Sequence, residues 1–241
     1  MTMRALNLLG GIELAGVAAE SSNRLLAQTK VVAFLAYMAL APTGRYQRRD
    51  LLVGLLWPEL DQSHARAALR KAVLAVRTAL GDDALLGRSD EELLLVADRL
   101  SCDVRLFRER IDHSELAAAL EMGHGELMPG FHLPGCAEFG SWLDSERAAV
   151  TERASAAAWA LAIQLEASND LSRAGKLARR AAKYEWSDER VLRRTMLMLQ
   201  RIGDRAGALK LFEDCARRLK AELEMEPSAE TAALAATMRQ A

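Results

Sequence analysis

The sequence predicts a mainly α-helical protein in which a small α+β domain, residues 1–100, precedes an all-α domain, residues 101–241. Three observations lead to this prediction. Short strand patterns flank three helical patterns only in the first hundred residues, and beyond Asp103 every apolar pattern has helical spacing. Five prolines and 15 glycines in 241 residues also leave long stretches free of helix breakers.

The first domain begins with strand patterns. Residues Arg4–Leu14 alternate loosely between apolar and other side chains around Gly10-Gly11, which predicts a strand, a turn and a second strand. Lys30–Leu40 is apolar at helical spacing and ends at a Pro-Thr-Gly turn. Tyr46–Trp57 is predicted as a second helix, with its leucines facing inward.

The third predicted helix is Gln62–Leu80. Asp61 precedes it as an N-cap, and Gly81 supplies the left-handed position that ends it. One face carries apolar residues at intervals of three and four, namely Ala65, Leu69, Ala72, Val73, Val76 and Leu80. The opposite face carries Arg66, Arg70, Leu74 and Arg77 in one row, with His64 and Lys71 beside it.

A β-hairpin is expected after this helix, with strands Ala84–Gly87 and Glu92–Val96 and a tip at Arg88–Glu91. Strands, three helices with a tight turn before the last, and then a hairpin are the order of a winged helix-turn-helix. Proteins of this class place the last helix in the major groove of DNA. The sequence therefore predicts that Gln62–Leu80 is a recognition helix.

Local charge supports this prediction. The whole chain has a net charge of −1, whereas Arg24–Leu80 contains nine basic and three acidic residues, a net charge of +6. The candidate DNA-binding residues are Arg48, Arg49, Ser63, His64, Arg66, Arg70, Lys71, Arg77 and Arg88. Arg66 and Arg70 are expected to read bases, because guanidinium groups form paired hydrogen bonds with guanine, and Arg48 and Arg49 to contact phosphates.

The second domain is predicted to be helical throughout. Short helices are expected at Val104–Ile111 and Ser114–Met122, followed by the Gly/Pro-rich loop Gly123–Gly135 and the long helix Glu138–Ala167.

A repeat follows. Residue types recur after 34 positions, which is the tetratricopeptide period, in the pairs Asp170/Asp204, Ala174/Ala208, Lys176/Lys210, Leu177/Leu211 and Ala182/Ala216. Repeats of this kind stack into a superhelix whose concave face binds protein segments.

Other function classes lack their motifs. The sequence has no phosphate-binding glycine loop, no dinucleotide fingerprint and no zinc-protease motif, so no enzyme is predicted and no cofactor is expected. His124, His132 and Cys136 lack the fourth ligand of a structural zinc site, so no metal site is predicted. The longest apolar run is too short to span a membrane, and three scattered cysteines indicate a reduced, cytoplasmic protein.

Several motifs, in a fixed order, carry a resemblance to a known family. They are Leu51–Pro58, Ala65–Val73, Cys102-Asp103-Val104, Gly125–Phe131, Trp142–Arg147 and Leu219–Pro227. With these motifs the sequence resembles the antibiotic-regulatory-type bacterial transcriptional activators. Those proteins join a response-regulator-type winged helix to a tetratricopeptide-like bacterial transcriptional activation domain.

The resemblance implies sequence-specific binding to direct repeats in promoter DNA, contact with RNA polymerase and a homodimer on DNA. Two features differ from the usual pattern. Family members usually have a Gly-Tyr pair in the second wing strand, where this chain has Glu91-Glu92-Leu93-Leu94, and this acidic tip is unfavourable for phosphate contact. Many members also continue beyond the activation domain, so the chain fits either a compact regulator or part of a longer one.

A protein-interaction scaffold is the alternative. In that case the winged helix docks a protein or an acidic partner rather than DNA, which the near-neutral charge of residues 1–100 and the acidic hairpin tip would permit. The dependence of DNA binding on salt and on sequence distinguishes the two functions.

Overall fold

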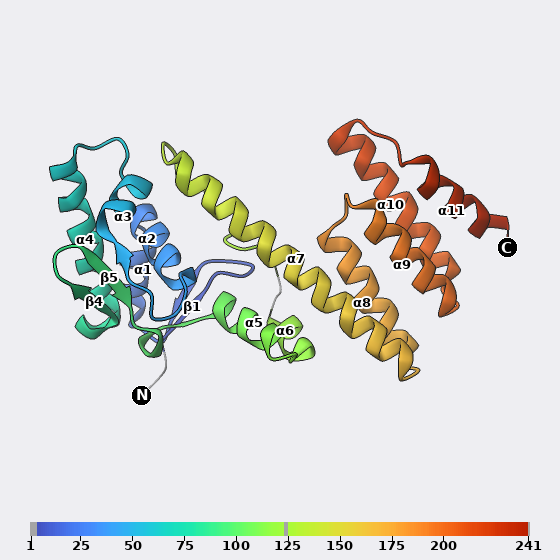
Figure 1. The fold of residues 1–241 in the computed structure, drawn as a ribbon, viewed down its shortest axis with the longest axis horizontal. Coiled ribbons are helices and arrows are strands. Elements are labelled where there is room, and N and C mark those ends of the chain that lie inside the picture. Colours follow the sequence, from blue (N-terminus) through green and yellow to red (C-terminus); the bar gives the residue numbers. More distant parts are fainter. Residues whose placement is uncertain (1–3, 123–124, 241) are drawn as a thin grey trace. The chain divides into compact units, whose positions relative to one another are not determined.

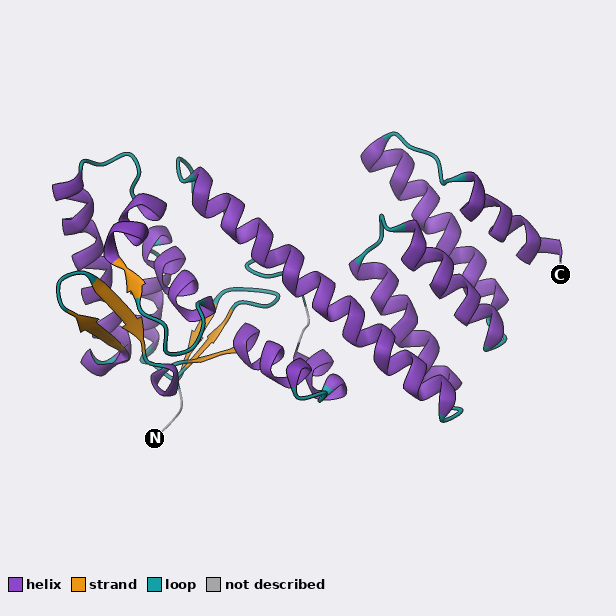
Figure 2. Cartoon of the chain, viewed as in Figure 1, coloured by secondary structure: helices purple, strands orange, loops and turns teal. Residues whose placement is uncertain are grey.

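A computed structural model describes residues 4–122 and 125–240 of the chain. The chain divides into two compact units. The first comprises Met1–Glu115 and Glu121–Ala148, and the second comprises Leu116–Leu120 and Ala149–Ala241. Strands occur only in the first unit among the described residues, as Figure 2 shows.

A small sheet opens the first unit (Figure 1). Strands β1 (Ala5–Asn7) and β2 (Glu13–Ala15) pair antiparallel, as expected from the Gly-Gly turn between them. Strand β6 (Ser101–Cys102) pairs parallel with β1 and gives the order β2-β1-β6. The sequence pattern did not predict β6, because two residues are too few to show an alternation.

Four helices follow. They are α1 (Ala19–Leu26), α2 (Thr29–Leu40), α3 (Arg49–Leu56) and α4 (Gln62–Leu80). Helix α2 is the central one, with nine buried residues between Val31 and Leu40. Helix α1 was not predicted, because Leu25 is its only buried residue and polar residues dominate the rest.

The predicted helix Tyr46–Trp57 is wrong at its beginning. Gln47–Arg48 forms strand β3, and the helix starts at Arg49, whose backbone N–H donates to the Glu91 carbonyl at 2.8 Å. Strand β3 pairs with β5 (Glu92–Leu95), which also pairs with β4 (Leu85–Arg88), in the order β3-β5-β4. The error arose because Gln47–Arg48 is held by a partner more than 40 residues away in the chain, which a local pattern cannot show.

Asp103 joins the first sheet to α5 (Asp103–Asp112). Its carboxylate accepts hydrogen bonds from the backbone N–H groups of Leu8 and Leu9 at 2.8–3.0 Å and of Val104 at 2.7 Å. Helix α6 (Leu116–Met122) starts later than predicted, because Ser114 has a positive φ of 62° that a helix does not accommodate.

Arg147 fastens the Gly/Pro-rich loop to α7 (Ala137–Ala167). Its guanidinium donates to the backbone carbonyls of Leu127 at 3.0 Å, Met128 at 2.7 Å and Phe131 at 3.1 Å. Asp144 and Glu126 pair with the same group. Two of the motifs noted in the sequence, Gly125–Phe131 and Trp142–Arg147, are therefore one structural unit.

The second unit contains the repeat, in helices α8 (Leu171–Tyr184), α9 (Glu189–Arg201), α10 (Arg205–Leu223) and α11 (Ala229–Gln240). Asn169 and Gly203, which are 34 residues apart, both have positive φ. Each is followed by an aspartate whose carboxylate caps the next helix, Asp170 for α8 and Asp204 for α10. The period seen in the sequence is thus a repeat of helix boundaries.

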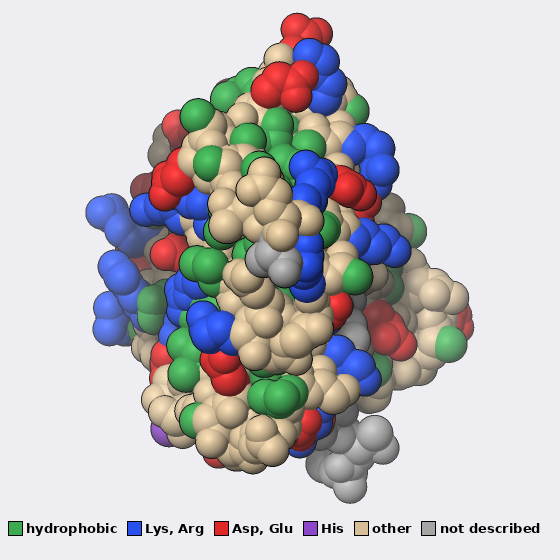
Figure 3. All heavy atoms as spheres, turned by 90° about the vertical axis from the view of Figure 1, so that its right-hand side faces the viewer, with side chains coloured by type: hydrophobic (Ala, Val, Ile, Leu, Met, Phe, Trp, Pro, Cys, Tyr) green, Lys and Arg blue, Asp and Glu red, His purple; other side chains and the backbone are tan. Residues whose placement is uncertain are grey.

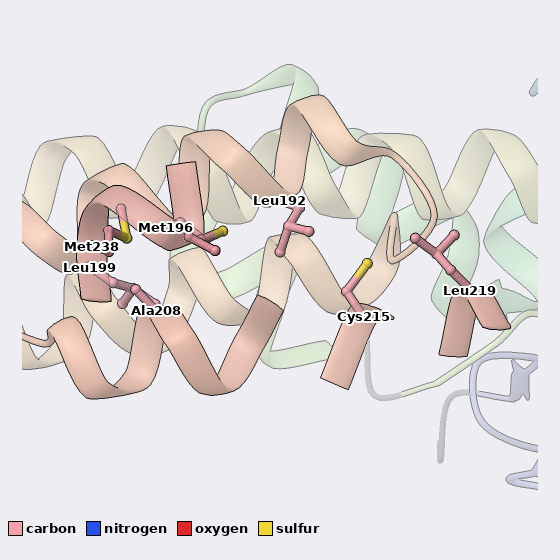
Figure 4. Close-up of a cluster of buried hydrophobic side chains, with 8 residues drawn as sticks. Leu192, Met196, Leu199, Ala208, Cys215, Leu219 and Met238 are labelled. Carbon is pink, nitrogen blue, oxygen red and sulfur yellow. The ribbon is translucent and has the colours of Figure 1, made fainter. Parts of the chain in front are cut away.

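One hydrophobic cluster of the second unit lies between α9, α10 and α11 (Figure 4). Its members are Leu192, Met196, Leu199, Ala208, Cys215, Leu219, Ala235 and Met238. Ala208 is fully buried, as is its counterpart Ala174, so both fill the position that a tetratricopeptide-like repeat keeps small. Within residues 4–122 and 125–240, no helix combines the length and apolarity needed to cross a bilayer.

Candidate nucleic-acid interface

Helix α4 begins at a capped turn. The Asp61 carboxylate accepts hydrogen bonds from the backbone N–H groups of Ser63 at 3.0 Å and His64 at 3.1 Å, and from the Ser63 hydroxyl at 2.8 Å. The His64 ring nitrogen Nδ1 lies 2.5 Å from the same carboxylate. Ser63 and His64, both predicted to contact DNA, are exposed but are turned back to the cap.

These hydrogen bonds, above all the one from the His64 backbone, hold the pKa of the Asp61 carboxyl well below its usual range. A carboxyl whose pKa is lowered by folding stabilises the fold above its unfolded pKa of about 4, and this stabilisation is lost as the pH falls. We expect Asp61→Ala to lower the melting temperature at pH 7, with a difference from wild type that shrinks below about pH 4. Asp61→Asn is the control, because the amide oxygen of asparagine still accepts a hydrogen bond at a pH at which the aspartate carboxyl is protonated. A difference that stays constant down to pH 3 would contradict the cap.

Arg66 does not point freely away from α4. Its Nη2 donates to the Asp50 carboxylate of α3 at 2.8 Å, and its Nε is buried without a hydrogen-bond partner. The hydrogen bond to Asp50 raises the pKa of Arg66, and the charges of Glu91 and Asp90 act in the same direction. Arg66 therefore has one partner within the protein before any DNA is bound.

Arg77 has a structural role. Its Nε and Nη2 donate to the backbone carbonyl of Leu85 at 3.2 and 2.8 Å, and this ties the first strand of the hairpin to α4. The row of four side chains predicted from the sequence is thus present on α4, but its last arginine holds the wing in place.

Arg49 lies beneath the wing, among other arginines. Burial lowers the pKa of its guanidinium, Asp90 opposes this shift, and the like charges of Arg77, Arg70 and Arg66 add to it. The Arg49 Nε is also buried without a hydrogen-bond partner. Three other guanidinium groups therefore lie close enough to Arg49 to repel it, with Asp90 as an opposing charge, and a concentration of positive charge of this kind attracts a polyanion.

Three of the predicted cations have no charged or hydrogen-bonded partner among the described residues. Arg48, Arg70 and Lys71 are exposed, and none has an ion pair or side-chain hydrogen bond within the part of the chain that the structure describes. Leu74 lies one turn further along α4 and is 64% exposed. Arg70, Lys71 and Leu74 thus form an exposed ridge on α4, which we call the α4 ridge.

The wing tip carries both signs of charge. Arg88 donates to Glu92 at 2.7 Å and lies over the Tyr46 ring, 4.6 Å from its centroid. Asp90 and Glu91 are exposed at the tip and act electrostatically on the arginines below them. Arg88 therefore braces the wing, and the acidic residues face the basic cluster.

The sequence did not predict one feature of this surface, the pairing of Asp50 with Arg66, since the two residues lie on different helices and no local spacing shows their contact. Leu74 was predicted on the outward row with Arg66 and Arg70, and its exposure agrees with that placement, but it was not named among the DNA-binding residues.

The residues considered as metal ligands differ in their surroundings. His132 is exposed, Cys136 is buried with its thiol donating to the Leu56 carbonyl at 3.4 Å, and His124 lies outside the described residues. Among residues 4–122 and 125–240, no three His, Cys, Asp or Glu side chains gather as metal ligands. The pKa values of all three cysteine thiols are raised by burial.

Comparisons with known proteins identify the architecture. The family model described as the bacterial transcriptional activator domain matches residues 107–239, more than half of the chain. The fold is similar to that of Mycobacterium tuberculosis EmbR, solved in complex with a low-affinity phosphopeptide, with a TM-score of 0.68 and 20% sequence identity. The alignment covers 100% of this chain and 66% of that one. No curated protein matches the sequence. The predicted fold class, a winged helix-turn-helix followed by a tetratricopeptide-like helical domain, is confirmed.

Proposed function

The chain belongs to the bacterial transcriptional activator domain family, and from this premise we propose that it activates transcription by binding promoter DNA through α4. The family is one of transcriptional regulators and not a class of enzymes. We assign DNA binding to residues 1–100 and activation, including contact with RNA polymerase, to residues 101–241.

The observation that carries the proposal is the exposed α4 ridge above a cluster of arginines. A recognition helix enters the major groove and presents its outward side chains to base edges. Arg70 is suited to guanine, Lys71 to phosphate or guanine, and the Leu74 side chain to a thymine methyl group. Arg66 remains a base-reading candidate that exchanges its Asp50 partner for DNA, at the cost of that ion pair.

Phosphate contact is proposed for the start of α3. Arg48 is exposed at the N-cap position of α3, and Arg49, which is half-buried beneath the wing, follows it. A helix N-terminus favours an anion, and two arginines beside it strengthen that preference. These residues position the protein without reading sequence.

The acidic wing tip is expected to weaken DNA binding. Asp90→Asn combined with Glu91→Gln removes two negative charges beside the arginine cluster, so affinity should rise about three- to tenfold. The affinity for the native duplex and the affinity for a shuffled duplex should rise equally, because charge carries no sequence information. Asp82→Asn combined with Asp98→Asn removes the same charge at the opposite end of the hairpin and is the control for an electrophoretic mobility-shift titration. Equal gains in both double variants would show that net charge, and not the wing, sets the affinity.

We further propose that the protein binds direct repeats as a homodimer. Two winged helices in one orientation would each present an α4 ridge to one half-site, so half-sites should be separated by whole helical turns. Titrating duplexes with one or two half-sites, and with an inserted half turn, tests this. The proposal requires cooperative binding to two half-sites that the half-turn insertion abolishes.

The scaffold alternative makes a different prediction. If the winged helix docks a protein, DNA affinity will show neither a sequence preference nor a steep dependence on salt. The exposed cations of the α4 ridge favour DNA, because a recognition helix with paired or buried cations would have no donors to offer.

A further inference from the structure

A basic groove lies between the two equivalent helices of the repeat, α8 and α10. Its volume is about 440 Å³. Arg179 and Lys183 of α8 and Arg217 and Arg218 of α10 line it, with Asp214 as the one acidic side chain of the lining. The groove lies entirely within the second unit and is remote in sequence from α4.

The repeat places a cation twice at the same position. Lys183 and Arg217 are 34 residues apart, which is the repeat period, and both line the groove. Helix α8 as a whole carries five basic residues and no acidic one. Viewed from the side of the C-terminal helices, the surface shows Lys and Arg side chains together with Asp and Glu side chains, with hydrophobic side chains among them (Figure 3).

The floor of the groove is apolar and aromatic. Trp186, in the turn between α8 and α9, lies beneath the Arg218 guanidinium, whose carbon is 4.0 Å from the ring centroid. The buried Cys215 thiol donates to the Trp186 carbonyl at 3.3 Å and so holds this turn against α10. Cys215 and Leu192 line the groove from the helical core (Figure 4).

The cations of the groove already bind carboxylates in this geometry. Arg179 pairs with Asp204, Arg217 with Asp214, and Arg218 with Glu222 at 3.0 Å. Lys183 is exposed and has no ion pair within the described residues. A ligand with several carboxylates can add to Lys183 and exchange for the weak exposed pairs, while an apolar side chain packs on the apolar floor beside Trp186.

From this arrangement we infer that the groove between α8 and α10 binds an acidic peptide segment of another protein, with an apolar side chain inserted beside Trp186. With the pairing carboxylates of Asp204, Asp214 and Glu222 included, the groove keeps an excess positive charge at Lys183, which favours an acidic segment and speeds its association. The inference does not depend on DNA binding by α4.

The test uses the full chain and two labelled synthetic peptides of about ten residues. In one, glutamates flank a central Leu-Phe pair, and in the other, glutamines replace the glutamates. Fluorescence anisotropy should show the acidic peptide binding about tenfold tighter than the neutral one at low salt.

Matched double variants locate the site. Lys183→Glu with Arg217→Glu should weaken the acidic peptide by about tenfold or more, because both changes reverse charge at the rim. Lys176→Glu with Lys210→Glu makes the same charge change at another pair of repeat positions outside the groove lining, and should alter binding by less than about twofold. Lys183→Glu alone should also weaken binding of the acidic peptide. Because this single variant breaks no ion pair among the described residues, it controls for a loss of binding that is caused by misfolding.

Three results would overturn the inference. They are equal affinity for the two peptides, equal losses in the two double variants, or a groove variant that weakens binding of a promoter duplex as strongly as that of the peptide. The last result would assign the groove to nucleic acid instead.

Discussion

Arg70→Ala is expected to cost about 1–3 kcal/mol of binding to the native DNA site and to relax specificity at one base position. Arg70 is exposed on α4 and has no partner in the described chain that would need to be broken first. The loss should therefore appear in discrimination between bases. Anisotropy titrations with duplexes carrying each base at every position of a half-site measure it.

Arg48→Ala is the matched control, since it removes the same group from an exposed position at the start of α3. It should weaken all duplexes alike and reduce the salt slope by about one. Arg66→Ala is a less direct test of base reading, because this variant removes a candidate base contact and also leaves Asp50 without its ion-pair partner. If Arg70→Ala weakened native and shuffled duplexes equally, α4 would not read bases through Arg70.

Arg147→Ala is expected to reduce the free energy of unfolding by about 2–4 kcal/mol. The substitution removes the donor for the carbonyls of Leu127, Met128 and Phe131 at once and leaves Glu126 and Asp144 without their cation. The loop that these carbonyls belong to should loosen first. Urea denaturation, with amide hydrogen exchange at residues 126–131, measures both effects.

Arg70→Ala serves here as the stability control, because an exposed arginine without a partner should change the unfolding free energy by less than about 0.5 kcal/mol. Arg147→Lys distinguishes the contribution of the charge from that of the hydrogen-bond geometry. The lysine ammonium keeps the charge but lacks the planar fork of donors with which the guanidinium reaches three carbonyls. Full stability of Arg147→Lys would show that charge alone holds the loop.

Local patterns predicted the long helices well. The spacing of apolar residues and the cap residues Asp61 and Gly81 placed α4 at its observed bounds, since both signals lie within the helix and its ends. The repeat was visible for a similar reason, because its turns fall at Asn169 and Gly203, where the backbone requires a positive φ.

Contacts between distant segments were not predictable. Strand β3 exists because Gln47–Arg48 meets β5, and helix α1 is fixed largely by burial of Leu25. At the candidate interface, nine side chains were predicted from composition and position on the helix. Three of these cations, Arg66, Arg77 and Arg88, are hydrogen-bonded within the protein. Arg88 meets Glu92 across the predicted hairpin, whereas the contact between Arg66 and Asp50 joins two helices and has no local signal.

DNA binding by the winged helix is tested most directly by anisotropy of the wild-type chain with a duplex from its own upstream region and a shuffled duplex, across a salt series. If α4 reads promoter DNA, the native duplex should bind more tightly than the shuffled one, and log K should fall with log salt with a slope of about −0.9 per phosphate contact. Equal, weak binding to both duplexes with a shallow slope would contradict it, and would make the winged helix a docking surface for a protein.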